Sequence, residues 1–244
     1  MTSLGKMLRV LDLFGPESQK LDVESIAQRM ELSRATAYRY VKELCNAGLL
    51  WRLEGGYALG PRLIELDWMM RQYDPLILSG HESMRELAEK TGLAVFISVY
   101  YDGRVINTHV EQPSTELSLS FGRGRPLPVF RGAQSKVLVS HQKGRKLKKI
   151  FEEYIETDPA YDYSWKEFSQ MTKRIRQDGY CETHDELNLG LTGIAAPIFN
   201  SANDDVVGSL AAAGDTANFE LLRSEVVIDL VKEYARVIGA KLAP

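Results

Sequence analysis

Apolar positions in the first sixty residues recur with the period of short α-helices. A helical period runs over residues 3–14, and a second amphipathic segment covers residues 21–30, with Asp22 as a candidate N-cap. A third segment begins at Ser33, another candidate N-cap, and ends at Gly48. The apolar positions of this third segment have the i, i+3, i+4, i+7 spacing of one buried face: Ala37, Tyr40, Val41 and Leu44. The pattern predicts three helices, with only a few residues between the second and the third.

A β-hairpin is predicted directly after the third helix. Apolar residues dominate 49–53 and 57–60, and the Gly55-Gly56 pair between them can supply the positive φ angles of a tight turn. Two helices joined by a short turn and followed by a hairpin are typical of a winged helix-turn-helix. The sequence therefore predicts such a domain over residues 1–60.

The polar face of the third predicted helix has the chemistry of a nucleic-acid reader. Hydroxyl, phenol, guanidinium and ammonium groups can reach phosphates and base edges. The candidate DNA-binding residues are Ser33, Arg34, Thr36, Tyr38, Arg39, Lys42 and, on the hairpin, Arg52. The whole chain carries 30 Lys and Arg against 33 Asp and Glu, a net charge of −3, so any DNA contact must come from a local patch. The hairpin tip, Glu54 to Gly56, has no cation of its own, which predicts a weak grip on phosphate.

The pattern changes after residue 60. Residues 61–74 predict a linker helix that begins at Pro61 and has so many apolar positions that it is expected to pack on another surface. Residues 75–244 then predict an α+β domain, an antiparallel sheet with flanking helices, because strands and helices interleave without a βαβ rhythm. Helices are predicted over 75–91, 132–141, 143–154, 164–178 and 220–242. Strands are predicted over 93–101, 104–111, 117–121, 180–183, 191–199 and 206–213, and loops over 122–128 and 184–190.

The cysteines and the hydropathy of the chain indicate the cellular compartment in which the protein is expected to work. Cys45 and Cys181 are far apart in the sequence and do not form a disulfide framework, so a reducing cytoplasm is expected. No apolar run reaches transmembrane length, and no membrane partner is expected. No motif predicts a cofactor.

Taken in order, several segments resemble the IclR family of bacterial transcriptional regulators. The segments are the first helix, Leu32 to Arg39, Tyr57 to Gly60, Pro128 to Leu138 with Lys136, Asp178 to Cys181, Asp185-Glu186 with Gly190, and Ile194 to Pro197. The resemblance covers nearly the whole chain. It implies a winged helix-turn-helix, a linker helix and a C-terminal GAF-like domain that binds a small effector. It also implies homodimers or dimers of dimers on double-stranded DNA with near-palindromic operators.

The resemblance also implies an effector pocket, and here the sequence departs from the family. Members that bind small polar acids such as glyoxylate use amides in the loop before the lysine, together with an Asp, a Cys and serines. These positions fall here on Arg131, Gly132, Ala133, Gln134, Thr183, Gly193, Ala211 and Ala213, with Asp185 as a further candidate. Each change removes a polar group or volume. A larger, less polar effector is therefore predicted, an aromatic or long acyl acid whose carboxylate meets the amides near Ala133 and Gln134, with Arg131 as a further contact.

Alternative functions rest on fewer residues. Cys181, His184 and Asp185 could supply a nucleophile, a base and an orienting carboxylate, but the odd spacing of Cys181 and His184 places them on opposite faces of a strand. A metal site from Cys181, His184, His109 and His141 has no recognisable spacing. We therefore predict no catalytic residues and no metal site. A ligand-binding module without specific DNA binding remains the other alternative, and Asp185 and Glu186 fit a solvated acidic loop as well as a pocket.

Overall fold

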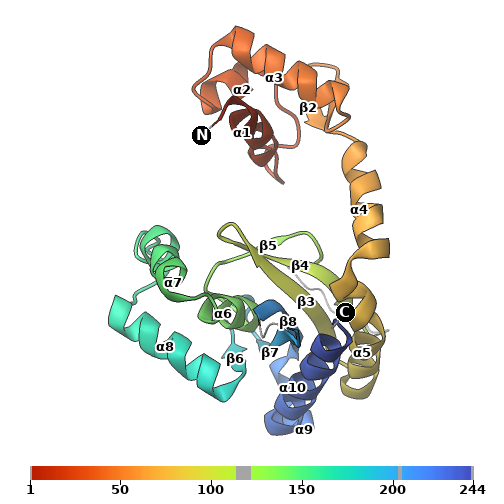
Figure 1. Cartoon of the computed structure of the whole chain (residues 1–244), viewed down its shortest axis with the longest axis vertical. Helices are drawn as coiled ribbons and strands as arrows, with labels where there is room; N and C mark the ends of the chain where they lie inside the picture. Colours follow the sequence, from red (N-terminus) through yellow and green to blue (C-terminus); the bar gives the residue numbers. More distant parts are fainter. Residues whose placement is uncertain (1, 114–121, 203–204, 243–244) are drawn as a thin grey trace. The chain divides into compact units, whose positions relative to one another are not determined.

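The computed structural model describes residues 2–113, 122–202 and 205–242 of the chain. The chain forms two compact units, Met1–Asp74 and Pro75–Pro244 (Figure 1). Each unit has its own buried core. The predicted strand at 117–121 lies outside the described residues.

The first unit is built from short helices and a two-stranded hairpin. Its elements are α1 (Ser3–Leu8), the 3₁₀ helix η1 (Arg9–Leu13), α2 (Val23–Arg29), α3 (Arg34–Asn46), β1 (Leu50–Leu53), β2 (Gly56–Leu59) and α4 (Arg62–Tyr73). Strand β1 pairs with β2 in antiparallel register, Leu50 opposite Leu59. The core of this unit contains the predicted apolar face of α3 together with Val10, Ile26 and Leu50.

The second unit is organised around a six-stranded antiparallel sheet of strand order β5-β4-β3-β8-β7-β6. The strands are β3 (Ala94–Tyr101), β4 (Arg104–Glu111), β5 (Pro126–Leu127), β6 (Cys181–His184), β7 (Leu191–Asn200) and β8 (Asp205–Asp215). The helices are α5 (Pro75–Thr91), α6 (Ala133–Ser140), α7 (Gly144–Ile150), the π turn η2 (Phe151–Ile155), α8 (Trp165–Asp178), α9 (Thr216–Leu222) and α10 (Ser224–Lys241). This arrangement confirms the predicted α+β class, an antiparallel sheet with flanking helices.

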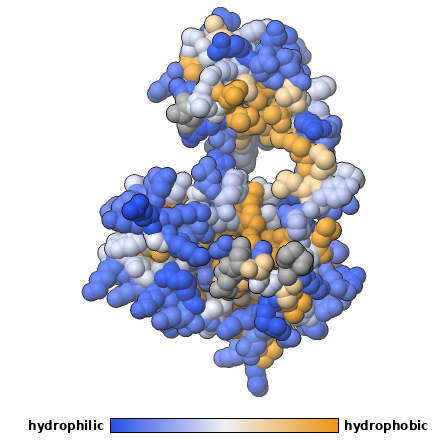
Figure 2. All heavy atoms as spheres, viewed as in Figure 1, coloured by the Kyte–Doolittle hydropathy of each residue, from blue (hydrophilic) through white to orange (hydrophobic). Residues whose placement is uncertain are grey.

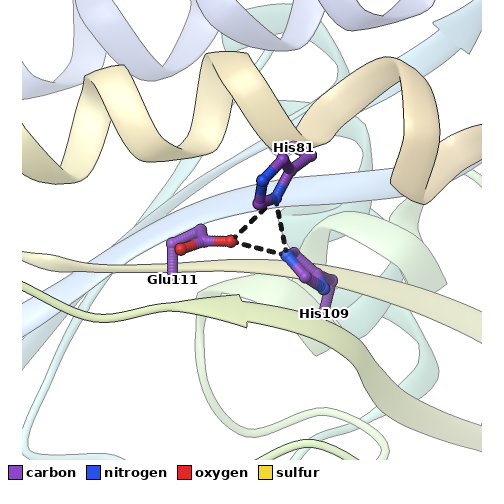
Figure 3. Close-up of side chains that lie close together, drawn as sticks. All are labelled: His81, His109 and Glu111. Carbon is purple, nitrogen blue, oxygen red and sulfur yellow. Dashed lines mark hydrogen bonds and ion pairs between the residues drawn. The ribbon is translucent and has the colours of Figure 1, made fainter. Parts of the chain in front are cut away.

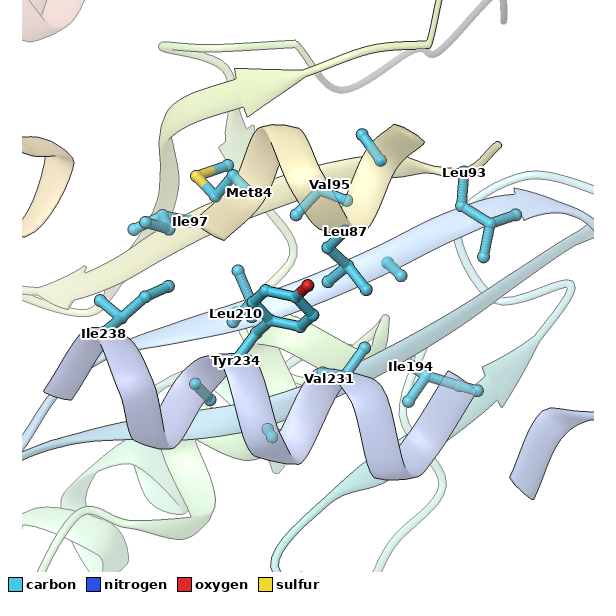
Figure 4. Packing of buried hydrophobic residues seen from close by; sticks show 14 of the residues in the cluster. Met84, Leu87, Leu93, Val95, Ile97, Ile194, Leu210, Val231, Tyr234 and Ile238 are labelled. Atoms are coloured by element: carbon cyan, nitrogen blue, oxygen red, sulfur yellow. The ribbon is translucent and has the colours of Figure 1, made fainter. Parts of the chain in front are cut away.

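The two faces of the sheet have different neighbours. Helices α5 and α10 pack on one face, where Met84, Ile97, Leu210 and Ile238 belong to the largest core cluster (Figure 4). Helix α6 packs on the other face against β7 and β8, and α8 packs on α6. Because side chains alternate along a strand, residues of β3 divide between the two faces, with Ile97 toward α5 and Phe96 toward α6.

Several predicted elements differ from the structure in detail. The helix predicted over 220–242 is broken at Arg223, which has a φ of 62°, into α9 and α10. The helix over 3–14 tightens into a 3₁₀ turn at Arg9, and the helix over 143–154 ends in the π turn η2. The predicted loop 122–128 contains the short strand β5. Hydrophobic periodicity continues across such local changes of backbone geometry and therefore does not report them.

Candidate nucleic-acid interface and ligand pocket

Helix α3 is fixed at its start by its cap and along its length by its apolar face. The Ser33 hydroxyl accepts a hydrogen bond from the Thr36 amide at 3.2 Å. The preceding helix α2 is capped in the same way, with the Asp22 carboxylate 2.7 Å from the Ser25 amide. Hydrogen bonds from Ser25 lower the pKa of Asp22. The four apolar residues predicted to face inward are all buried, which confirms the predicted orientation of the helix.

The opposite face of α3 presents most of the predicted DNA-binding side chains to solvent. Arg34, Tyr38, Arg39 and Lys42 are exposed. Thr36 is half-buried, and its hydroxyl shares a 2.9 Å hydrogen bond with the Ser33 hydroxyl. This face therefore combines two guanidinium groups, an ammonium group and a phenol.

One of these cations already has a protein partner. The Arg34 guanidinium lies 2.6 Å from the Glu24 carboxylate, and both side chains are largely exposed. Exposed ion pairs of this kind contribute at most about 1 kcal/mol. A phosphate can therefore replace Glu24 at little cost. The Arg39 guanidinium lies 5.8 Å from the centre of the Tyr40 ring, within the range of a cation–π contact.

The hairpin turn differs from the sequence prediction at one of its two glycines. Gly55 has a φ of 73°, whereas Gly56 does not have a positive φ and is the first residue of β2. A Cβ on Gly56 would lie 2.9 Å from the carbonyl oxygen of Leu21. Leu21 and Tyr57 exchange backbone hydrogen bonds of 3.0 and 2.8 Å. The second glycine therefore allows the segment before α2 to approach the hairpin.

This close approach brings a cation to the hairpin tip. The Lys20 ammonium donates a 3.3 Å hydrogen bond to the carbonyl of Glu54, and Lys20 is exposed. Arg52 is also exposed, on β1. Lys20 lies 34 positions before Glu54, so no local pattern indicates its place; only the bridge between Leu21 and Tyr57 brings it to the hairpin tip.

A pocket lies between the sheet and the start of α6, on the face away from α5. Its cavity volume is about 40 Å³, and the space reaches about 470 Å³ when the open mouth is included. The lining contains apolar and polar side chains from five segments of the chain: Phe96, Asn107, Gln134, Thr183, Glu186, Leu187, Asn188, Leu191, Thr192, Gly193 and Ala213. A mixed lining of this kind suits an organic molecule with one polar end.

Four of the predicted effector residues line the pocket, namely Gln134, Thr183, Gly193 and Ala213. Ala133 is adjacent, because a Cβ built on Gly193 would lie 3.9 Å from the Ala133 Cβ. Ala211 is buried in the cluster beneath α6 and is not among the lining residues. Asp185 is exposed, and its carboxylate accepts from the Gly190 amide at 2.5 Å, so it closes a turn outside the pocket.

The remaining two candidates are Arg131 and Gly132, whose donors were expected to bind a ligand. In the structure, both donate to Glu186 instead. Its carboxylate accepts from the Gly132 amide at 2.9 Å and pairs with the Lys136 ammonium. Arg131 donates to the Glu186 carbonyl at 2.7 Å. Gly132 and Arg131 therefore bind the chain itself in this structure. The sequence placed Lys136 and Glu186 in separate segments, and no local pattern indicates that they pair.

Among the described residues, three polar side chains of the pocket form no hydrogen bond: Gln134 and Thr183, which are buried, and Asn188, which is half-buried. By contrast, Thr192 bonds to His184 at 2.8 Å and to Thr216 at 3.0 Å. Asn107 accepts from the buried Ser98 hydroxyl at 2.7 Å. Buried polar groups are normally paired, so Gln134 and Thr183 are the side chains most suited to bind a polar ligand group.

The residues of the enzyme alternative do not form a catalytic arrangement. Burial raises the pKa of Cys181 to about 12, so its thiol stays protonated at neutral pH. The Nδ1 of His184 bonds to Thr192, and its Nε2 lies 3.5 Å from Glu182. Cys181 packs in the cluster beneath α6. His141 lies elsewhere, with its Nδ1 2.8 Å from the carbonyl of Val137.

Within the described ranges, no helix is both long and apolar enough to span a bilayer.

Comparisons with known proteins match both units of the chain. Residues 3–54 match the family described as the IclR helix-turn-helix domain, and residues 73–240 match the bacterial transcriptional regulator IclR C-terminal family. The transcriptional regulator KdgR of Escherichia coli is 26% identical over 99% of this chain and 93% of its own length.

Solved structures share the fold. An IclR transcriptional regulator from Alicyclobacillus acidocaldarius has a TM-score of 0.80 at 22% identity, covering 99% of this chain and 98% of its own. An IclR homologue from Microbacterium hydrocarbonoxydans, solved with 4-hydroxybenzoate, has a TM-score of 0.75 at 21% identity and covers 99% of both chains. The two family matches together span most of the sequence, and the relatives are regulators rather than enzymes. The chain belongs to the IclR family of DNA-binding transcriptional regulators, whose C-terminal domain binds a ligand.

Proposed function

We propose that the protein is a sequence-specific regulator that reads DNA with α3. The observation that carries this proposal is the exposed cationic face of a capped helix whose opposite face is buried. Arg34, Arg39 and Lys42 would bind phosphates or base edges, and Tyr38 and Thr36 would add hydrogen bonds. Arg52 on the hairpin and Lys20 beside the hairpin tip would bind backbone phosphate. In this proposal residues 1–60 bind DNA, 61–74 link the units and 75–244 bind the effector.

We further propose that the protein acts as a homodimer or a dimer of dimers on a near-palindromic operator. Among described residues, 12 of the 19 exposed large hydrophobic side chains lie in the first 74 positions, so apolar exposure is concentrated in the smaller unit. Helix α4 carries Ile64, Trp68 and Tyr73 with 74, 57 and 69% exposure. Figure 2 shows apolar side chains on the part of this unit that adjoins α4. Surfaces of this kind favour association, and a two-fold dimer matches two-fold DNA.

The proposed effector is a small organic carboxylate with an aromatic or acyl group. The apolar part would contact Phe96, Leu187 and Ala213, and the polar end would meet Gln134, Thr183 and the first amides of α6. The first amides of a helix lack intrahelical partners and attract anions. The 4-hydroxybenzoate bound by the Microbacterium homologue is consistent with an aromatic acid. The proposed setting is the cytoplasm, where DNA is available and two free cysteines stay reduced.

A fluorescence-anisotropy titration tests the regulator proposal. The purified full chain is titrated onto the intergenic fragment beside its own gene and onto scrambled DNA of equal length, each at two salt concentrations. We expect tighter, salt-sensitive binding to the intergenic fragment. Aromatic and acyl acids are then added singly, and an acid that occupies the pocket is expected to change operator affinity. Equal affinity for both DNAs would contradict specific recognition.

A further inference from the structure

Three ligand-type side chains meet on the face of the second unit opposite the effector pocket. His81 lies on α5, and His109 and Glu111 lie two residues apart on β4, so the two strand residues share one face of the sheet. Their partners on β3 are Ile97 and Val95, both in the core cluster that packs against α5. Figure 3 shows the two imidazoles and the carboxylate pointing toward one another.

The distances between the three ligand atoms are those of a metal coordination sphere. The Glu111 Oε1 lies 2.7 Å from the His109 Nε2 and 3.0 Å from the His81 Nδ1, and the two nitrogens are 3.5 Å apart. Ligands at about 2.0–2.1 Å from an ion are about 2.9 Å apart at octahedral angles and about 3.4 Å apart at tetrahedral angles. An ion can therefore join all three atoms with only small side-chain movements.

We propose that His81, His109 and Glu111 bind a divalent transition-metal ion, with zinc as the first candidate. Two imidazoles and one carboxylate form a donor set that zinc takes in proteins, and imidazole nitrogen disfavours magnesium and calcium. The side chain of His81 is 60% exposed, whereas those of His109 and Glu111 are 20 and 22% exposed. The ion would enter from the α5 side and keep at least one coordination position for water.

The proposed site is separate from the effector pocket and has a distinct consequence. A bound ion would tie α5, which directly follows the linker helix in sequence, to strand β4 of the sheet. The same strand contributes Asn107 to the pocket. The pairing of β3 with β4 shifts register between His109 and Asn107, and Asn107 lines the pocket with Phe96 on the other side of the sheet. Zinc is therefore expected to stabilise the second unit without competing for the organic effector.

The test uses the full chain, free of any affinity tag and stripped of metal with a chelator. Zinc is titrated in competition with a chromophoric chelator, and cobalt is followed by its visible absorption. We expect one zinc per chain with micromolar or tighter affinity and a zinc-dependent rise in Tm. His81→Ala and Glu111→Gln should each weaken zinc binding at least about tenfold, since each removes a direct ligand. His81→Ala alters an exposed helix position and should leave the fold intact.

The matched control is His184→Ala, which removes an exposed histidine outside the cluster and should bind zinc as the unaltered chain does. Stoichiometric zinc binding that survives in both His81→Ala and Glu111→Gln would overturn the proposal. So would failure of the unaltered chain to bind zinc at about 100 µM, because a preformed three-ligand site should be saturated at that concentration. In that case the three side chains form only a hydrogen-bonded cluster.

Discussion

The two units place their functional groups in different ways. In the first unit, the candidate DNA-binding groups stand on one exposed helix face and one hairpin, so their spacing follows from helical geometry. In the second, the pocket is assembled from β3, β4, α6, β6, the loop before β7, β7 and β8. Its shape therefore depends on how the sheet and α6 pack. A change to the packing of the second unit should therefore affect the pocket and leave the DNA-binding face intact.

The largest expected effect is on the stability of the second unit. In Gly239→Ala, the new Cβ would lie 2.2 Å from the Phe199 carbonyl oxygen, so α10 would have to move away from β7. We expect a loss of about 3 kcal/mol from the free energy of unfolding. Thermal unfolding should show a transition of the second unit at lower temperature and an unchanged first unit. Gly122→Ala is the control, since no atom of the described residues lies within 4 Å of the added Cβ.

If Gly239→Ala shifted all unfolding by the same amount, the two units would not behave as separate bodies. If the second unit of Gly239→Ala unfolded at no lower temperature than that of Gly122→Ala, the inference that α10 packs too closely on β7 to admit a Cβ would be wrong.

The next largest effect separates effector binding from DNA binding. A Cβ on Gly193 meets only ordinary contacts, 3.7 Å from the Thr183 hydroxyl and 3.9 Å from Ala213. Gly193→Leu should therefore fold and fill the pocket, whereas Gly193→Ala should fit with the pocket open. We expect the Leu variant to lose about thirtyfold in affinity for the effector acid, about 2 kcal/mol, with unchanged operator affinity in its absence. Isothermal titration calorimetry with the acid identified in the screen measures the affinity of each variant. If the Leu variant kept full affinity for the acid, the effector would bind somewhere other than this pocket.

A smaller effect concerns Glu186, whose carboxylate already binds at the start of α6. Glu186→Gln removes a carboxylate close to the amides that are proposed to hold the effector and leaves Lys136 without its anion. We expect about tenfold tighter binding of a carboxylate effector, about 1.4 kcal/mol. The primary amide of the same acid is the control ligand and should bind both proteins alike. Weaker binding of the acid to the variant would show that Glu186 supports the ligand instead of competing with it.

The smallest expected effect is at the hairpin tip. Lys20→Ala removes one exposed cation next to Glu54 and should weaken operator binding a few-fold. The slope of the logarithm of affinity against the logarithm of salt concentration should fall by about 0.9, the value for one phosphate contact. Gln19→Ala is the uncharged neighbouring control. An unchanged slope in Lys20→Ala would mean that the hairpin tip does not contact DNA.

The contrast between the units also explains what could be predicted from the sequence. The caps and buried face of α3 were predicted correctly because they depend on residues within one helix. The pairing of Glu186 with Lys136 and the position of Lys20 depend on segments that only the fold brings together. The His81, His109 and Glu111 cluster was missed for the same reason, since α5 and β4 meet through packing. Hydrophobic periodicity predicts which face of a helix or strand is buried, but it does not predict which other element packs against that face.

A titration with two arginine variants tests whether the exposed face of α3 recognises specific DNA. Arg39→Ala and Arg85→Ala, an exposed arginine of α5 that pairs with Glu89, are compared with the unaltered chain on the intergenic fragment and on scrambled DNA. We predict that Arg39→Ala loses about 1–3 kcal/mol of affinity for the intergenic fragment and most of its preference over scrambled DNA. Arg85→Ala should match the unaltered chain. Equal affinities for all three proteins on both DNAs would contradict specific recognition by α3.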